Sequence, residues 1–236
     1  MGRTRENGAK RPPDVWYAGP VSLKRVLIIA DKIHPYIYRN SFPDGLGHLD
    51  LILGAGDLPG DYLEFVATKS PVPLLYVHGN HNEEHVFDYL GRETPPGGAE
   101  SIHGRVVKRS GLIVAGWGGA PRYRDGGTGQ YAGREVRQGL NRMRLPLAIQ
   151  RWRSGRALDI FLTHAAPIGP HEGADYAHRG CVYLNRFDAH YRPLLHAHGH
   201  VHEYEGKKGA YTTPDGVQIV NGYGYVIVEL EAPDEP

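Results

Sequence analysis

The sequence predicts an α/β protein in which two packed, mixed β-sheets are flanked by helices, and three observations support this fold class. Short apolar runs recur along the chain. Continuous runs of this kind, without alternating polar residues, are typical of strands that are buried on both faces. Amphipathic or irregular stretches separate them and leave room for helices. The chain has 236 residues, which is enough for one α/β domain with a sizeable core.

Five of these apolar runs end abruptly at polar residues, and we predict a buried strand for each. The first run covers residues 26–30 and ends at Asp31, and the second covers residues 51–55 and ends at Gly56-Asp57. The other three are residues 73–77, 160–162 and 194–197, which end at His78-Gly79-Asn80-His81, Thr163-His164 and His198-Gly199-His200. Each run is long enough to cross a small sheet once.

Helices are predicted for residues 60–68 and 134–154, which lie between the apolar runs. The second stretch is basic and amphipathic, and Pro146 is expected to break or kink it because proline lacks the helical N–H. Four other segments have a more hairpin-like, antiparallel β pattern: residues 104–107, 112–117, 217–221 and 223–230. Segment 116–133 is rich in glycine with interleaved aromatic residues, and we interpret it as an ordered loop over a site.

Composition and charge exclude several classes of protein. Residues 1–22 are polar and basic and are predicted to form a flexible leader before a single domain at residues 23–236. No apolar run reaches the roughly 20 residues of a membrane span. Lys+Arg 27 against Asp+Glu 26 gives a net charge of +1, so charge alone gives no reason to expect tight nucleic-acid or membrane binding. The single cysteine, Cys181, cannot form an internal disulfide, which predicts a cytoplasmic protein and a buried packing role for the thiol.

A potential metal ligand stands at the carboxyl end of nearly every apolar run. Sites in open α/β sheets form at these ends, so the five ends would deliver Asp, Asp, Asn, His and His-x-His to one edge. Each has an ordinary alternative, because an Asp after a strand is commonly a turn or cap residue and Asn80 could be a turn former. On an extended segment, His200 and His202 would point the same way, as chelation requires. Of the 14 histidines, more than half lie between His164 and His202.

In this order, the motifs resemble those of the calcineurin-like metallophosphoesterase superfamily over residues 25–228. The matching pieces are Asp31, Gly56-Asp57, Gly79-Asn80-His81, Thr163-His164 and Gly199-His200-Val201-His202. The resemblance implies a four-layer αββα sandwich with a dinuclear metal site at the edge of the sheets. It further implies that one group of residues holds the two metals: Asp31 and His202 on the first, Asp57 between both, and Asn80, His164 and His200 on the second. His81 would protonate the leaving oxygen or stabilise the transition state.

The chemistry of phosphoester hydrolysis explains why these residue types are needed. The reaction requires a strong nucleophile at neutral pH and neutralisation of the charge on the phosphoryl oxygens. Two divalent ions supply both by lowering the pKa of a bridging water, which gives a hydroxide, and by clamping the phosphoryl oxygens. A mixed Asp, Asn and His donor set suits Mn, Fe or Zn better than Ca. The expected cofactor is therefore a pair of divalent transition-metal ions.

Two positions depart from the family pattern. The usual first motif is Asp-x-His, whereas this chain has Asp31-Lys32-Ile33-His34. Either a bulge brings His34 to the first metal, or that site lacks this ligand. The acidic residue that often follows Gly-Asn-His is Asn82 here, so Glu83, Glu84 or another group would have to orient His81. The Asp-Arg-Gly continuation of protein Ser/Thr phosphatases is absent, and the chain is more similar to small bacterial members of unassigned substrate.

We interpret the chain as a metal-dependent phosphoesterase, with a phosphodiester favoured, that acts on a small-molecule or nucleotide substrate. Five residues are candidate substrate contacts, each with a solvated loop position as the alternative: Arg122, Tyr123, His171, Asp175 and His178. Two other interpretations stay open. The basic stretch 134–156 suggests a nuclease, although a solvated helix face explains it as well. The altered first motif suggests a catalytically weakened metal-binding scaffold.

Overall fold

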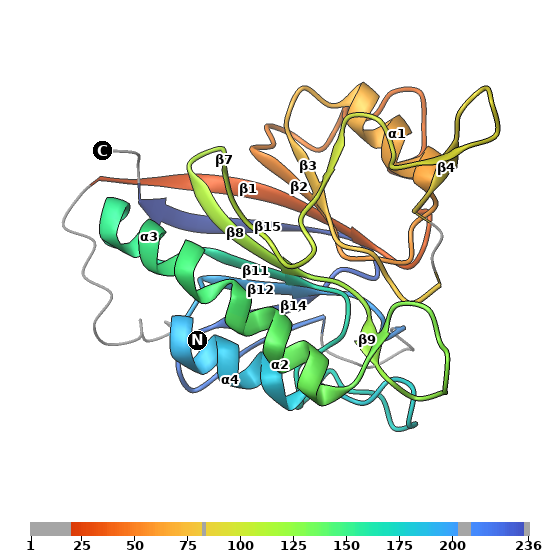
Figure 1. Ribbon diagram of the computed structural model, residues 1–236. Coiled ribbons are helices and arrows are strands. Elements are labelled where there is room, and N and C mark those ends of the chain that lie inside the picture. Colours follow the sequence, from red (N-terminus) through yellow and green to blue (C-terminus); the bar gives the residue numbers. More distant parts are fainter. Residues whose placement is uncertain (1–19, 82–83, 203–208, 234–236) are drawn as a thin grey trace, which may run out of the picture.

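The computed structural model describes residues 20–81, 84–202 and 209–233. The first element, β1, is Val21–Ala30, so the predicted leader lies almost entirely outside the described residues and stays a prediction. Figure 1 shows two packed sheets with helices on their outer faces. In the described part of the chain, no helix combines the length and the apolar character that crossing a bilayer requires.

The first sheet has five strands in the order β15-β1-β2-β3-β6. Its strands are β1, β2 (Leu51–Gly54), β3 (Leu74–Tyr76), β6 (Ala99–Ser101) and β15 (Gly224–Pro233). From β1 to β6 the neighbours are parallel, and β15 is antiparallel to β1 along its whole length. The carboxyl ends of β1, β2 and β3 therefore lie at the same edge.

The second sheet has six strands in the order β13-β14-β12-β11-β8-β7. Its strands are β7 (Val106–Arg109), β8 (Leu112–Trp117), β11 (Ile160–Thr163), β12 (Leu195–His198), β13 (Ala210–Thr212) and β14 (Gln218–Asn221). The four central strands are parallel, and an antiparallel strand closes each edge. Two small pairs lie outside the main sheets: β4 (Val86–Phe87) with β5 (Glu93–Thr94), and β9 (Ala120–Pro121) with β10 (Gln130–Tyr131).

Alternation along the strands builds the layers. In β1, Val26 and Ile28 belong to the core between the two sheets, while Leu27 and Ile29 pack on the other side with α1 (Gly60–Lys69). The outer face of the second sheet is covered by three helices: α2 (Gly133–Arg142), α3 (Arg144–Ser154) and α4 (Val182–Tyr191) (Figure 1). Helices therefore cover the outer faces of two mixed sheets, which confirms the predicted fold class.

The basic helical stretch is divided at a different residue from the one predicted. α2 ends at Arg142 and α3 begins at Arg144, so the break is at Met143 and not at Pro146. Pro146 lies in the first turn of α3, where a backbone N–H has no helical acceptor and proline costs little. α3 ends before Gly155, whose φ of 74° is the left-handed conformation common after helix ends.

The C-terminal β segments do not pair with each other. β14 belongs to the second sheet and β15 to the first, so the chain passes from one sheet to the other between Asn221 and Gly224. The predicted antiparallel pairing is present for β7 with β8, for β14 with β13 and for β15 with β1. β7 begins at Val106, later than predicted. Local sequence pattern could not distinguish these pairings because strand partners are chosen by the packing of the sheets.

Candidate metal centre

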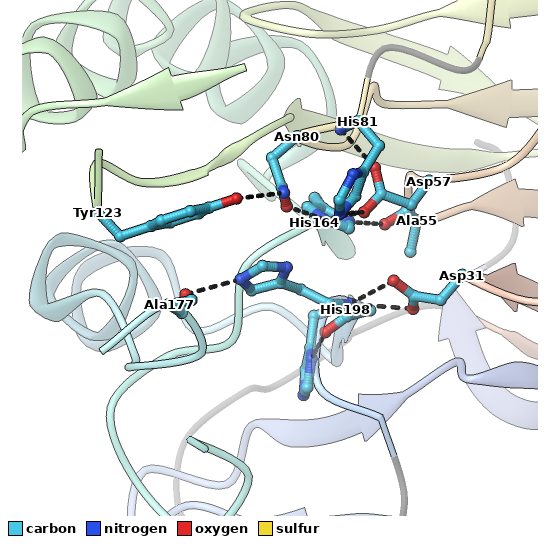
Figure 2. Close-up of polar contacts among 11 residues, drawn as sticks. Asp31, Ala55, Asp57, Asn80, His81, Tyr123, His164, Ala177 and His198 are labelled. Carbon is cyan, nitrogen blue, oxygen red and sulfur yellow. Dashed lines mark hydrogen bonds and ion pairs between the residues drawn. The ribbon is translucent and has the colours of Figure 1, made fainter. Parts of the chain in front are cut away.

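Strand ends from both sheets meet at one edge of the sandwich (Figure 2). Asp31 directly follows β1 and Asp57 lies just beyond β2, while His164 directly follows β11. The N–H of Asp31 donates to the carbonyl of Gly56 at 3.1 Å, and the N–H of Gly199 donates to the carbonyl of His164 at 3.0 Å. These bonds tie neighbouring ends together, so the side chains that follow the strands converge.

His164 is fully buried at the centre of this group. Its Nδ1–H donates to the carbonyl of Ala55 at 2.8 Å. Its Nε2 lies 2.9 Å from Asn80 Oδ1 and 3.2 Å from Asp57 Oδ2. These partners are acceptors, so both ring nitrogens carry protons. Burial lowers the pKa of His164, but the hydrogen bond and charge of Asp57 outweigh burial and the net shift is upward.

The pKa of Asp57 is shifted downward by the same pair of groups. Burial raises the pKa of its carboxyl, but the hydrogen bond and charge of His164 outweigh this effect and hold the pKa at about 2. The backbone N–H of His81 also donates to Asp57 Oδ1, at 3.0 Å. Asn80 Nδ2 donates to the hydroxyl of Tyr123 at 3.2 Å, which leaves Asn80 Oδ1 turned toward His164 (Figure 2).

Asp31 and His200 form the second half of the group. The N–H of His200 donates to both carboxylate oxygens of Asp31, each at 3.0 Å. Burial raises the pKa of Asp31 to about 6, and the nearby charge of Asp57 adds to this rise. The Nε2–H of His200 donates to the carbonyl of Ala177 at 2.9 Å, so Nδ1 keeps the lone pair. Burial lowers the pKa of His200 to about 3, which favours the neutral ring that metals bind.

The chemistry of this donor set fits a divalent cation. Asp57, His164 and His200 each offer a ligand atom within 4.8 Å of the others. The Ala55 carbonyl fixes Nδ1–H of His164, which directs Nε2 toward the acceptor oxygens of Asp57 and Asn80, where a cation can replace the shared proton. A cation would also relieve the repulsion between two partly buried carboxylates. Carboxylate, amide and imidazole donors together suit transition metals.

Two motif glycines are required by close approach. A Cβ at Gly79 would overlap the carboxylate of Asp57. A Cβ at Gly199 would lie 2.6 Å from Asp31 Oδ2, closer than real Cβ atoms approach an oxygen. The glycines that precede Asn80 and His200 therefore let the chain pass directly against the two carboxylates.

The extended geometry predicted for His200 and His202 is wrong. β12 ends at His198, and His200 has a φ of 66°, in the left-handed region. Asp31 and Asp57 also have positive φ values, 60° and 50°, so three site residues carry backbone conformations that cost roughly 1–3 kcal/mol each. The ring of His202 lies 5.0 Å from that of Tyr223. Burial lowers the pKa of His202 and the charge of Asp57 opposes this shift, so His202 lies near the ligand group, and its binding to the first metal stays a prediction.

His34 contacts Tyr36 and Tyr225. Its Nδ1 accepts a hydrogen bond from the N–H of Tyr36 at 3.2 Å, and its ring packs on Tyr225 with centroids 4.6 Å apart. The extra residue in the first motif thus leaves His34 in contact with aromatic residues of its own loop and of β15.

The structure places His81 in solvent beside Asp57. Its side chain is 61% exposed, and its Nε2 lies 3.7 Å from Asp57 Oδ2. Of the acidic residues proposed to orient it, Glu84 is buried and lies 3.6 Å from Nε2 of His85 instead. Glu83 lies outside the described residues. The carboxylate beside His81 is therefore that of Asp57.

The predicted substrate contacts separate into three groups. Arg122 and Tyr123 line a cavity next to the site. His178 lies with its ring 4.9 Å from that of His200, and its Nδ1 is 2.8 Å from Asp175 Oδ2. His171 is only 3% exposed, with Nδ1 2.8 Å from His198 Nε2, so its contact with substrate stays a prediction.

Sequence reasoning missed several residues around the site. The carbonyls of Ala55 and Ala177 orient the two buried histidines, and no side-chain pattern reveals a carbonyl. Arg124, Tyr176 and Arg179 line the same cavity as Tyr123. The signal for these three was present, since arginine and tyrosine alternate in residues 122–124 and recur in residues 176–183.

A buried hydrogen-bonded chain supports the strand end that carries His164. The hydroxyl of Thr163 donates to the carbonyl of Ala165 at 2.7 Å and lies 2.8 Å from His196 Nε2. On its other side, His196 Nδ1 lies 2.7 Å from Asp188 Oδ2. Because the hydroxyl proton is already used, Nε2–H of His196 is the donor to Thr163. The network fixes the threonine of the Thr-His motif and links α4 to β11 and β12.

Beside the site, His78 and His103 form a second aromatic cluster with Trp117 and Tyr131. The rings of the two histidines are 4.4 Å apart, and His78 Nε2 lies 3.0 Å from the hydroxyl of Tyr131. The N–H of Gly118 donates to His103 Nδ1 at 2.9 Å. Burial lowers the pKa of His103 to about 4.

This cluster makes the folded protein sensitive to acid. The unfolded chain protonates His103 near pH 6.5, whereas the folded chain does so only near pH 4. The stabilising contribution of the neutral His103 is therefore complete above about pH 6.5 and is lost as the pH falls toward 4.

His103→Asn keeps an acceptor for the N–H of Gly118 and should show a smaller fall in Tm between about pH 7.5 and 5 than the unaltered protein. Thermal unfolding followed by circular dichroism measures the Tm, with a substitution of the exposed His190, His190→Asn, as the control. Equal falls in Tm in the unaltered protein and in both variants would contradict the prediction.

No family model matches the chain, and no curated protein is similar to it in sequence. Among solved structures it is similar to TT1561 of Thermus thermophilus, with 14% identity, 89% of this chain and 99% of that chain covered, and a TM-score of 0.52. GAP50, the anchor in the inner membrane complex of Plasmodium, has 13% identity over 84% of this chain and 71% of its own, with a TM-score of 0.47. The Thermus thermophilus sulfate thiohydrolase SoxB has 15% identity over 80% of this chain and 39% of its own, with a TM-score of 0.35.

Fold and site together define a class: a two-sheet α/β sandwich with a group of candidate metal ligands at the carboxyl ends of its strands. The similarity to TT1561 supports the sandwich over nearly the whole length of both chains.

Proposed function

We propose that this chain is a metal-dependent phosphoesterase of the calcineurin-like superfamily, which hydrolyses a small phosphoester with a diester favoured. The arrangement around His164 Nε2 carries the proposal, because oxygen atoms of Asn80 and Asp57 lie 2.9 Å and 3.2 Å from this nitrogen. A buried imidazole with its other nitrogen fixed by a carbonyl is how proteins commonly present histidine to a metal.

By the family pattern, Asn80, His164 and His200 would hold one ion, Asp31 and His202 the other, and Asp57 would bind both. Bound Mn, Fe or Zn would acidify a water and neutralise charge on the phosphoryl oxygens. The site on Asp31 is expected to be the weaker one, because the ring of His34 packs on Tyr225.

His81 is suited to the leaving-group side of the reaction. Its exposed ring can reach a substrate oxygen, and its backbone N–H and side chain both lie near Asp57. We assign to it the transfer of a proton to the leaving oxygen, a role that a solvent-facing imidazole next to a carboxylate can perform.

Hydrolysis of two model esters by metal-stripped protein tests this function. Bis-p-nitrophenyl phosphate and p-nitrophenyl phosphate should both be stable with the stripped protein and should turn over after addition of Mn, Zn, Ni or Mg in separate titrations. Turnover that needs a metal, with the diester cleaved faster, supports the proposal. Turnover that survives complete chelation would contradict it.

A metal-binding scaffold is the second candidate, favoured by the packing of His34 on Tyr225. In that case one ion per chain would bind without turnover of either ester. The nuclease alternative stays open. Six arginines of the basic stretch are exposed, whereas Arg156 is bonded within the fold. Its guanidinium donates to the carbonyls of Gly111 and Pro233 and lies 3.2 Å from Asp159.

A further inference from the structure

A cavity of about 650 Å³ lies beside the candidate metal centre, and the proposed function gives this cavity no role. One wall comes from residues 121–136 and the other from residues 176–183. Both walls are attached to candidate ligands: the hydroxyl of Tyr123 accepts from Asn80, and the carbonyl of Ala177 accepts from His200. Its volume is in the range of small-molecule sites. A substrate held at the metal centre can therefore extend into it.

The lining of the cavity is rich in aromatic side chains. Four tyrosines line it: Tyr123, Tyr131, Tyr176 and Tyr183. Val136, Ile168 and Cys181 also line it, and they offer no charge. Aromatic and apolar side chains together favour a planar ring, which tyrosines can contact through its faces.

Positive charge is concentrated at the same place. Arg122, Arg124 and Arg179 line the cavity and Asp125 is the one acidic residue among its described lining, although the whole chain has a net charge of only +1. Arg122 is paired with Glu135 at 2.9 Å, and Arg179 lies 4.0 Å from the ring centroid of Tyr176. In the described ranges no residue forms a hydrogen bond or ion pair with the guanidinium of Arg124. Its charge is thus available to an anion.

We infer that this cavity binds the part of the substrate beyond the scissile phosphate, and that this part is a planar aromatic ring carrying a second negative charge, as in a nucleotide. The inference rests on the proposed function for its place in the reaction. Tyr176 and its neighbours contact the ring, and Arg124 binds the additional anionic group. The ring and the anion together account for both features of the lining, which neither a sugar phosphate nor a neutral aromatic molecule would do.

Calorimetric titration of the metal-stripped 236-residue chain tests the inference without catalysis. The probes are adenosine 5′-monophosphate, adenosine, which lacks the anion, and ribose 5-phosphate, which lacks the ring. Adenosine 5′-monophosphate should bind at least about tenfold more tightly than either part. Tyr176→Ala should weaken it about tenfold and leave ribose 5-phosphate unchanged. Arg124→Ala should weaken both phosphates and reduce the dependence of binding on salt.

Matched controls are the exposed Tyr89→Ala and Arg153→Ala, which should bind all probes as the unaltered protein does. Equal binding of adenosine 5′-monophosphate and ribose 5-phosphate, or binding that ignores both cavity substitutions, would overturn the inference. The experiments distinguish a failure of the cavity assignment from a failure of the proposed function. Ester hydrolysis without binding of the nucleotide removes only the cavity assignment, whereas nucleotide binding without hydrolysis of any ester removes only the catalytic one.

Discussion

Replacing Asp57 with asparagine is expected to abolish metal retention and to reduce ester hydrolysis by about a thousandfold or more. The side chain keeps its size, and Oδ1 can still accept the N–H of His81. What disappears is the negative charge that lies 3.2 Å from His164 Nε2. Metal content by mass spectrometry and turnover of bis-p-nitrophenyl phosphate measure the result.

Asp50→Asn is a matched control for this experiment. Asp50 and Asp57 stand at opposite ends of β2, and their side chains are similarly shielded, with 13% and 11% exposure. Asp50 accepts the N–H of Arg25 and lies 3.5 Å from Lys24, far from the ligand group in the sheet. The control should keep metal and activity. An Asp57→Asn protein that is folded by circular dichroism and fully active would refute the metal centre.

The second large effect is expected for His81→Ala. Because its exposed ring is assigned to the proton of the leaving oxygen and holds no ligand position, the turnover number should fall by about 10²–10⁴-fold while the metal content stays unchanged. An ester whose leaving group needs no proton, such as a nitrophenyl ester, tests the proton-donor role of His81 directly. The loss should be smaller for a nitrophenyl ester than for an alkyl ester of the same phosphate.

His48→Ala is a suitable comparison for this variant. His48 is 79% exposed and lies 3.5 Å from Asp50 Oδ1, so it forms the same kind of imidazole–carboxylate pair at the other end of β2. It should leave turnover unaffected. If His81→Ala instead lost metal and activity together, its role would be structural, and the assignment as a proton donor would be wrong.

Much of the fold was predictable because a strand that is buried on both faces is a continuous run of apolar residues in the sequence. The continuous apolar runs 26–30, 51–55 and 160–162 all became strands with both faces covered. The abrupt end of each run also predicted which residues would reach the sheet edge. Asp31, Asp57 and His164 all lie there, because parallel strands place their carboxyl ends on the same side.

Strand partners and exact helix ends were not readable in the same way. The segments that became β14 and β15 have similar composition and are separated by two residues, yet they belong to different sheets. A strand's own residues specify which face is apolar, but its neighbour is decided by how whole layers pack. The break at Met143 likewise depends on the packing of α2 and α3 against the second sheet.

The sequence by itself determined the two-sheet α/β class and the residue types available at its edge, because hydrophobic period and motif spacing are local properties. Only the tertiary structure decided which of those residues meet. It placed Asp57, Asn80, His164 and His200 together, and it packed the ring of His34 on Tyr225. It also assembled an aromatic, arginine-lined cavity from two segments about 50 residues apart in the chain. Such convergence depends on backbone carbonyls, left-handed turns and layer packing, which leave no periodic signal in the amino-acid order.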